Sequence, residues 1–170
     1  MEFTLRDFRR NDFETLWRID QKCFAPGIAY SRMELAAYIR RRGAFTLIAE
    51  PIVGDDSSRP GDPSPDSEPV HPVLGFIVAE ADRRRFGHIL TIDVPPSSRR
   101  LGVGSKLLTT AEDRLRSALC PVVILETAVD NATALAFYKR NRYDIVKTIP
   151  RYYPNGLDAF VLEKELLPHR

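Results

Sequence analysis

A glycine-containing turn, Arg99 to Lys106, stands between a β-rich run and the clearest amphipathic helix of the chain. The β-rich run spans His88 to Val94, and apolar residues recur at helical spacing from Val103 to Leu119. A compact apolar run from Pro121 to Thr127 follows and is typical of a strand. Strand, helix and strand in this order predict a βαβ unit, whose two strands lie parallel in one sheet.

The flanking segments predict further strands and helices around this unit. Asn11 to Glu14 and Ser31 to Glu34 each resemble the capping box that opens a helix. The expected helices are 13–23, 31–39 and 132–139, and the expected strands are 3–8, 44–50, 73–81, 144–149 and 159–163. These elements predict an α/β fold with a mixed, mostly antiparallel central sheet and helices on both faces.

Composition predicts a single domain over residues 1–170. A chain of 170 residues with 44% hydrophobic residues can bury a core without disulfides or metals. Cys23 and Cys120 lack the spacing of metal ligands or a disulfide framework, so we expect two buried thiols and no metal. The net charge of +2 gives no argument for nucleic acid, and no run is long enough to span a membrane. The first residues do not resemble a signal peptide, which predicts a cytoplasmic location.

One segment, residues 54–72, differs from the rest in composition. It contains five prolines, five acidic residues and one arginine, with almost no apolar side chains. We expect a disordered surface loop there, because such a segment cannot pack against a core. The remainder of the chain is correspondingly more basic, which suits an anionic cofactor or a merely dispersed positive surface. We hypothesise that deleting the loop alters substrate preference and leaves cofactor affinity intact.

The turn from Arg99 to Lys106 has the properties of an anion site. Backbone N–H groups at a helix start are free to bind a ligand, and the helix dipole adds partial positive charge. A P-loop would need Lys106 directly after a glycine, and a dinucleotide fingerprint would need a glycine in place of Leu107. The pattern Arg-x-x-Gly-x-Gly fits Arg99 to Gly104 completely. An ordinary glycine turn before a helix is the alternative.

With the segments that follow it, this turn resembles the acetyl-CoA-binding core of the GNAT superfamily of N-acetyltransferases. The segments are Leu125 to Thr127, Asp130 to Asn131 and Ala136 to Tyr138, in the order that a βαβα core requires. The resemblance covers residues 73–164 and implies the GNAT fold, acetyl-CoA as co-substrate and no metal. It implies cofactor contacts at Ile92, Asp93, Val94, Arg99, Arg100, Leu101, Gly102, Val103, Gly104, Ser105 and Asn131, of which Asn131 is also suited to cap a helix.

Three residues are candidates for the chemistry. Acetyl transfer requires a base to deprotonate the amine and an acid beside the leaving thiolate. Glu126 stands in an apolar strand and Tyr138 on the following helix, and the resemblance implies that they are base and acid. His88, at the start of a β-rich run, is a second candidate base. Steps of two would place it on one strand face with Leu90, Ile92 and Val94. For each residue, a structural role is the alternative.

Two aromatic segments suggest the kind of acceptor. Arg151 to Ala159 resembles the β-hairpin of protein N-terminal acetyltransferases, in which tyrosines hold the peptide backbone. The resemblance implies peptide contacts at Tyr152 and Tyr153, and at Phe24, Pro26 and Tyr30 on an opposite wall. An α-amine with a pKa near ~7.8 also demands less of a base than a lysine near ~10.4. Aromatic packing within the loops is the alternative.

The sequence therefore predicts an enzyme that acetylates an amine, most similar to the group of ribosomal-protein-alanine and other protein N-terminal acetyltransferases. The expected acceptor is the α-amine of a protein such as a ribosomal protein. A lysine or small-amine acetyltransferase and a non-catalytic acyl-CoA-binding module are alternatives. One departure from the family pattern is Arg142-Tyr143 in place of Gly-Phe, which predicts a distorted helix end.

Overall fold

Seven strands form one twisted sheet in the computed structural model, which describes residues 1–52 and 72–168. The strand order is β1-β2-β3-β4-β5-β7-β6, and only β4 and β5 pair in parallel. The predicted mixed, mostly antiparallel sheet is thereby confirmed. The strands are β1 (Phe3–Asp7), β2 (Ala44–Pro51), β3 (Gly75–Ala81), β4 (Gly87–Asp93), β5 (Val122–Ala128), β6 (Asp144–Ile149) and β7 (Ala159–Glu165).

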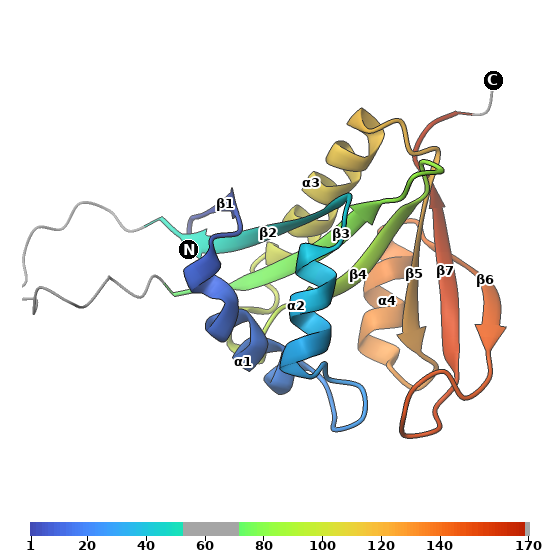
Figure 1. The fold of residues 1–170 in the computed structure, drawn as a ribbon, viewed down its shortest axis with the longest axis horizontal. Helices are drawn as coiled ribbons and strands as arrows, with labels where there is room; N and C mark the ends of the chain where they lie inside the picture. Colours follow the sequence, from blue (N-terminus) through green and yellow to red (C-terminus); the bar gives the residue numbers. More distant parts are fainter. Residues whose placement is uncertain (53–71, 169–170) are drawn as a thin grey trace, which may run out of the picture.

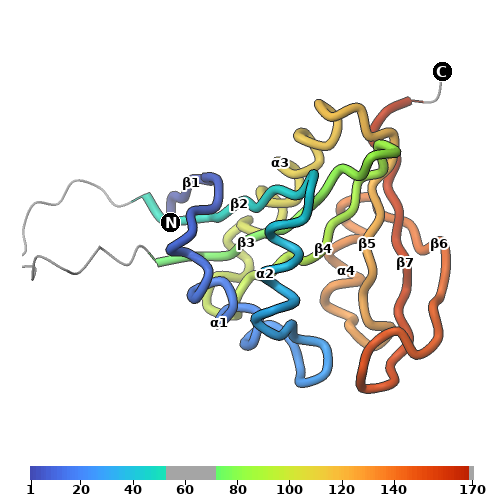
Figure 2. The backbone as a smooth tube through the Cα atoms, in the orientation of Figure 1, coloured from blue at the N-terminus to red at the C-terminus, as the bar shows by residue number. Residues whose placement is uncertain are grey.

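Helices cover both faces of the sheet, as Figures 1 and 2 show. They are α1 (Phe13–Cys23), α2 (Arg32–Arg40), α3 (Val103–Ser117) and α4 (Ala132–Arg140). Leu16 of α1 and Leu35 of α2 pack on one face with Phe76, and all three side chains are fully buried. Leu107 of α3 packs in a separate core on the other face with Leu125 of β5. The two faces are called the α1/α2 face and the α3/α4 face below.

One predicted capping box is confirmed and the other is wrong. Ser31 caps α2 and exchanges hydrogen bonds with Glu34, whose carboxylate accepts the Ser31 N–H at 2.8 Å. At α1 the helix begins at Phe13, and Asp12 makes no side-chain cap to it. Asp12 instead accepts the N–H of Arg9 at 2.6 Å, within the short 3-10 turn Arg10–Asp12 that precedes the helix. Asp12 therefore caps the 3-10 turn that precedes α1 and makes no side-chain cap to the helix itself.

The parallel strands β4 and β5 diverge after a short contact. They pair only at Gly87 with Val123 and His88 with Ile124, although β4 continues to Asp93 and β5 to Ala128. Figure 1 shows the carboxyl halves of the two strands separating, with α4 on the side of the sheet that faces α3. The predicted βαβ unit is confirmed, but its strands are joined only at their starts.

A β-bulge changes which side chains of β4 share a face. The register of β3 and β4 shifts between Val78 and Ala79, so that β4 carries an extra residue near Leu90. Leu90 packs in the α1/α2 core, whereas Ile92 and Val94 pack against the α3/α4 core. The expectation that His88, Leu90, Ile92 and Val94 line one face is therefore wrong, because it assumed unbroken alternation.

The end of α4 keeps its expected geometry without a glycine. Arg142 has φ 68°, and its N–H and that of Tyr143 bind the carbonyls of Lys139 and Tyr138 at 3.1 and 3.0 Å. This is the hydrogen-bond pattern of a Schellman motif. Arginine pays the steric cost of the left-handed conformation that glycine would avoid. The predicted distortion is thus confined to strain at one residue.

The thiol expectation holds in part, since Cys120 is buried and Cys23 is half-buried; both are free. The predicted loop at 54–72 lies outside the described residues except for Pro72. Within residues 1–52 and 72–168, no helix is long and apolar enough to cross a membrane.

Candidate active site

The two candidate bases form one hydrogen-bonded pair. Nε2 of His88 lies 2.7 Å from Oε2 of Glu126, so the imidazole N–H can donate to the carboxylate. The pairing of β4 with β5 places His88 beside Ile124, and Glu126 follows two residues later on the same strand face. Both side chains are partly exposed, at 25% and 17%, so a substrate amine can reach them.

Two residues that the sequence analysis did not single out support this pair. Glu80 of β3 is the cross-strand partner of His88, and its Oε1 lies 3.8 Å from His88 Nδ1. The guanidinium of Arg41 binds the same carboxylate at 2.8 Å. A row of charged groups thus crosses three strands from Arg41 to Glu126. Glu80 was detectable in sequence as a lone carboxylate in an otherwise apolar strand.

Four tyrosines border the pair on the α1/α2 face. The rings of Tyr30 and Tyr38 pack at a tilt with centroids 4.9 Å apart, and the Tyr30 hydroxyl donates to the carbonyl of Leu90 at 3.1 Å. Tyr152 and Tyr153 form a second edge-on pair at 4.9 Å. Burial first, and then the nearby charge of Glu126, raise the pKa of Tyr152 to about 12. These contacts bring Tyr30, Tyr152 and Tyr153 to the border of the His88–Glu126 pair.

The loops that carry these tyrosines approach each other. A side chain at Gly27, in the α1–α2 loop, would place its Cβ 3.1 Å from Cβ of Asn155 in the β6–β7 loop. Gly27 also has φ 87°, which favours glycine. Phe24 is half-buried and Pro26 exposed in the same loop, and neither makes a contact that assigns it to substrate. The α1–α2 and β6–β7 loops therefore lie next to each other (Figure 1).

Tyr138 lies within the α3/α4 core, on the other face of the sheet from the tyrosines of the α1/α2 face. It is 7% exposed and packs edge-on against Phe137 and Tyr143. Burial raises the pKa of its hydroxyl above the ordinary value, and the charges of Asp93 and Tyr153 add to the effect. Within the described residues the hydroxyl has no hydrogen-bond partner. The group therefore stays protonated at neutral pH, as a donor without an internal acceptor.

The glycine-containing turn presents unpaired backbone amides. Arg100 and Gly102 have left-handed φ of 63° and 80°, and α3 starts directly after Gly102. The amides of residues 100–105 donate no backbone hydrogen bond, since the first donor in this turn is Lys106. Arg99 Nε binds the Val94 carbonyl at 2.9 Å and ties the turn to the end of β4. These free amides at a helix start fit the phosphates of an anionic cofactor.

Asn131 caps α4 as predicted, with its Oδ1 accepting the N–H of Ala134 at 3.1 Å. Gly104 has its α-carbon against the ring of Phe137, where an added Cβ would lie 3.4 Å from the ring. The start of α3 and the middle of α4 are therefore close. Within the described residues, no group of His, Cys, Asp or Glu side chains could hold a metal ion.

Two buried carboxyl groups lie beside Tyr30, below the α1–α2 loop. Asp20 of α1 and Asp93 of β4 are both fully buried, and their carboxyl groups interact with each other. Asp20 Oδ2 accepts the N–H of Tyr30 at 2.8 Å, while Asp20 Oδ1 and Asp93 Oδ2 have no other partner. Burial raises the pKa of Asp20 to about 6 and that of Asp93 well above its ordinary value. A proton held between the two carboxyls would satisfy both of these oxygens.

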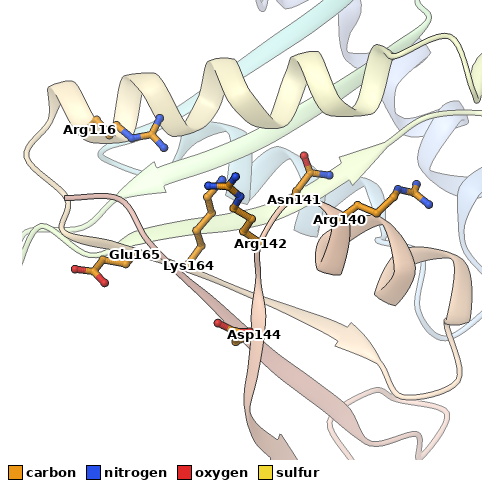
Figure 3. A pocket seen from close by; sticks show the side chains of 7 residues that line it. All are labelled: Arg116, Arg140, Asn141, Arg142, Asp144, Lys164 and Glu165. Atoms are coloured by element: carbon orange, nitrogen blue, oxygen red, sulfur yellow. The ribbon is translucent and has the colours of Figure 1, made fainter. Parts of the chain in front are cut away.

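A charged hollow of about 500 Å³ lies elsewhere, beside the carboxyl half of α3. Figure 3 shows Arg142 and Lys164 pointing toward α3 within it. Lys164 and Arg116 are bound to the buried carboxylate of Glu112, at 2.7 and 3.5 Å. The hollow contains none of the residues that the sequence analysis assigned to catalysis or binding. It is separate from the acetyl-transfer site.

Residues 64–142 match the family described as Acetyltransferase (GNAT) family. These residues, slightly less than half of the chain, are similar to GNAT acetyltransferases. An uncharacterized N-acetyltransferase of Methanocaldococcus jannaschii is 37% identical over 94 residues, which cover 55% of this chain and 60% of that protein. N-alpha-acetyltransferase 30 of Schizosaccharomyces pombe is 32% identical, over 51% of this chain and 61% of its own. The chain thus spans about 55–61% of the length of such curated relatives.

Solved structures extend the similarity over nearly the whole chain. Ard1 from Thermoplasma volcanium superposes with a TM-score of 0.80 at 25% identity, over 99% of this chain and all of that chain. A chain of the NatC complex bound to Gag peptide and CoA gives 0.75 at 27% identity, over 98% of this chain and all of its own. The Escherichia coli ribosomal-protein-S18-alanine N-acetyltransferase gives 0.76 at 18% identity, over 99% and 97%, a likeness of fold.

Proposed function

We propose that this GNAT domain is an N-acetyltransferase that moves an acetyl group from acetyl-CoA to the N-terminal α-amine of a protein, such as a ribosomal protein, in the cytoplasm. The observation that carries the proposal is the hydrogen-bonded pair of His88 and Glu126 at 2.7 Å, bordered by tyrosines from two loops. A relative named N-alpha-acetyltransferase 30 and a similar chain solved with peptide and CoA support the same substrates.

The His88–Glu126 pair acts as the base in this proposal. An ammonium has no lone pair, so the amine must lose a proton before it attacks the thioester carbonyl. Glu126 accepts that proton, directly or through water, and His88 holds the carboxylate in place by its N–H. Glu80 in turn faces the other nitrogen of His88, and Arg41 binds the Glu80 carboxylate. The two candidate bases therefore need not be alternatives.

The turn before α3 holds the co-substrate. The free amides of residues 100–105 bind its phosphates, and the backbone of Ile92, Asp93 and Val94 lines its arm where β4 leaves β5. Acetyl-CoA supplies the activated acetyl group when bound. Tyr138 donates its hydroxyl proton toward the leaving sulfur, a role consistent with a buried, protonated phenol that lacks an internal acceptor.

The acceptor is held between the α1–α2 and β6–β7 loops. Tyr30, Tyr152 and Tyr153 contact its backbone, and Phe24 and Pro26 border its first residue. An N-terminal α-amine with a pKa near ~7.8 is substantially neutral at physiological pH, unlike lysine near ~10.4. A partly exposed carboxylate with one imidazole partner is a sufficient base for the former.

The test is thiol release from acetyl-CoA with short peptides that differ in one feature at a time. One peptide has a free N-terminus and no lysine, a second is blocked at the N-terminus and contains lysine, and a third is blocked without lysine; common small amines complete the panel. We expect turnover only with the free N-terminus. Turnover confined to lysine or small amines would overturn the acceptor, and CoA binding without turnover on any amine would indicate a non-catalytic module.

A paired variant checks the base in the same assay. Glu126→Gln removes the proton acceptor at nearly constant shape, and we expect kcat to fall by about 100-fold or more. Glu2→Gln is the matched control, because Glu2 is exposed at the far edge of the sheet. An unchanged kcat in Glu126→Gln would exclude Glu126 as the base.

A further inference from the structure

Two arginine triplets, far apart in sequence, meet at one end of the sheet. Arg40 to Arg42 end α2 and Arg83 to Arg85 form the turn between β3 and β4. The pairing of β2 with β3 brings these turns together, since the Ala81 N–H donates to the Gly43 carbonyl at 3.1 Å. Figure 1 shows both turns at the end of the sheet opposite the α1–α2 and β6–β7 loops.

Most of these arginines are exposed and without a counter-charge. Arg42, Arg83, Arg84 and Arg85 are exposed and form no ion pair within the described parts of the chain. The neighbouring Asp82 is already engaged, because its Oδ1 accepts the N–H groups of Arg84 and Phe86 at 2.8 Å each. That carboxylate shapes the turn. The guanidinium groups therefore face solvent as a concentrated positive charge.

Arg41 connects this charge to the catalytic face. Its guanidinium binds Glu80 and lies 4.8 Å from the ring centroid of Tyr38, which packs at a tilt against Tyr30. Glu80 in turn faces His88. We call the following surface the arginine surface: Arg41, Arg42, Arg83, Arg84 and Arg85. Through Arg41 it is continuous with Tyr38 and Tyr30, which border the proposed base.

The strand register sets how far the arginine surface lies from the site of transfer. Glu80 pairs with His88, Ala81 pairs with Gly87, and the turn with its three arginines follows at once. At ~3.4 Å per residue, the turn begins about 7 Å along the sheet from His88. An extended peptide advances by about 3.5 Å per residue. Glu126 lies two residues further from this turn along β5, so about four extended residues separate it from the turn. A chain that runs from the α1–α2 and β6–β7 loops back toward the β3–β4 turn would therefore bring side chains a few residues beyond the amine within reach of these guanidinium groups.

We propose that the arginine surface binds acidic side chains in the acceptor, about three to six residues after its N-terminal amine. The inference rests on the proposed function, because it assigns that acceptor a charge pattern. Guanidinium groups form charge-assisted hydrogen bonds with carboxylates and attract acidic chains at a distance. Arg41 connects the arginine surface to Tyr38 and, through Glu80, to the proposed base. This connection favours a peptide over a nucleic acid as the ligand.

The experiment compares two peptides with the same first two residues, one with Glu and the other with Gln at positions three to six. The enzyme variant R83Q/R84Q/R85Q removes the turn's charge, and R10Q/R18Q/R140Q removes the same charge from exposed positions elsewhere. For the unaltered protein and the control we expect the acidic peptide to have about tenfold higher kcat/KM at low salt, mostly through KM. For R83Q/R84Q/R85Q we expect the two peptides to differ by less than about twofold.

The preference for the acidic peptide should also decline in 0.5 M salt, where the Debye length is only about 4 Å. Equal kcat/KM for both peptides in the unaltered protein, or an undiminished preference in R83Q/R84Q/R85Q, would overturn the inference and leave the proposed function intact. Acetylation of neither peptide would refute the proposed function and the inference with it. If R83Q/R84Q/R85Q instead loses only affinity for a single-stranded RNA probe, with the peptide preference unchanged, the surface binds nucleic acid and the inference is wrong.

Discussion

At the scale of single residues, the environment of each side chain decides which chemistry it can perform. His88 and Glu126 are partly exposed and hydrogen-bonded to each other, so protons can be exchanged with solvent or substrate. Tyr138 is buried, and its elevated pKa keeps the hydroxyl protonated. An accessible carboxylate–imidazole pair and a buried, protonated phenol are suited to act as base and acid in one reaction.

Tyr138→Phe separates the catalytic role of this hydroxyl from packing. The ring would keep its contacts with Phe137 and Tyr143, and no internal hydrogen bond would be lost. We expect the free energy of unfolding to stay within about 0.5 kcal/mol, while kcat falls by about 100-fold. Steady-state kinetics and urea unfolding measure the two quantities.

Tyr143→Phe is the matched control, because its hydroxyl donates to Glu112 at 3.0 Å in the core. There we expect the reverse, a loss of about 1 kcal/mol or more in stability with little change in kcat. Full activity in Tyr138→Phe would exclude the hydroxyl as the acid.

At the scale of elements, two local irregularities position the site. The bulge in β4 turns Ile92 and Val94 to the α3/α4 face and places Asp93 against Asp20 on the other. The left-handed Arg142 ends α4 and allows the chain to enter β6. Each irregularity has a measurable energetic consequence.

Arg142→Gly should stabilise the protein. Glycine adopts φ near 68° without a steric penalty, so the Schellman end of α4 would form without strain. We expect the free energy of unfolding to rise by about 0.5–1 kcal/mol, net of the greater entropy of glycine in the unfolded chain. Lys139→Gly, inside α4, should instead cost about 1 kcal/mol in the same urea titration. Equal losses in both variants would show that Arg142 makes stabilising contacts that outweigh the strain.

The Asp20–Asp93 pair predicts a pH dependence of stability. The folded-state pKa of Asp20 is raised by burial to about 6 from its ordinary 3.8, so the folded protein retains protons that the unfolded chain releases. The stability from this pair is complete below about pH 4 and is lost as the pH rises through 6. Between pH 5 and 8 we expect the unaltered protein to lose on the order of 1–2 kcal/mol more than Asp93→Asn.

Asp93→Asn removes one ionisable group at constant shape, and its amide can donate to Asp20. Asp113→Asn, with a side chain 67% exposed on α3, is the control and should follow the unaltered protein. Urea unfolding at pH 5, 6, 7 and 8 measures the difference. Parallel profiles for Asp93→Asn and the unaltered protein would contradict a shared proton.

At the scale of the whole molecule, the sheet separates three tasks. The α3/α4 face holds the turn with free amides, the α1/α2 face holds the His88–Glu126 pair and its tyrosines, and the end at the β3–β4 turn bears the arginine surface. The two faces are close where β4 and β5 diverge, because Asp93 and Tyr153 both help to raise the pKa of Tyr138 there. A co-substrate and an acceptor can therefore approach from opposite sides.

Shortening the segment between β2 and β3 tests this separation. The strands pair in register from Ala44 with Glu80 to Ala49 with Gly75, independently of residues 54–71. If a short Gly-Ser turn replaces those residues, we expect unfolding free energy to rise by no more than about 1 kcal/mol. CoA affinity, measured by calorimetry, should be unchanged, while the ranking of basic and acidic acceptors shifts. A loss of CoA affinity would contradict this arrangement.

Much of the fold follows from local signals in the sequence. Apolar periodicity, the Ser31 capping box and the turn at Arg99 to Gly104 are encoded within a few residues, so they predict elements and an anion site directly. Unbroken alternation fails at β4 because a bulge depends on the neighbouring strand. The helix predicted to be capped at Asn11 has Asp12 as its N-cap residue instead, and the Asp12 carboxylate is engaged by Arg6 and by the N–H of Arg9.

The order of the elements, the glycine turn and the residue types available for acid–base chemistry can be predicted from the amino-acid sequence, since these depend on short-range geometry. The folded structure was needed to show that His88 and Glu126 form one pair, that Glu80 and Arg41 support it, and that two distant arginine triplets adjoin. These contacts depend on strand register and on which strands are neighbours, and a chain of residues read one after another does not specify either.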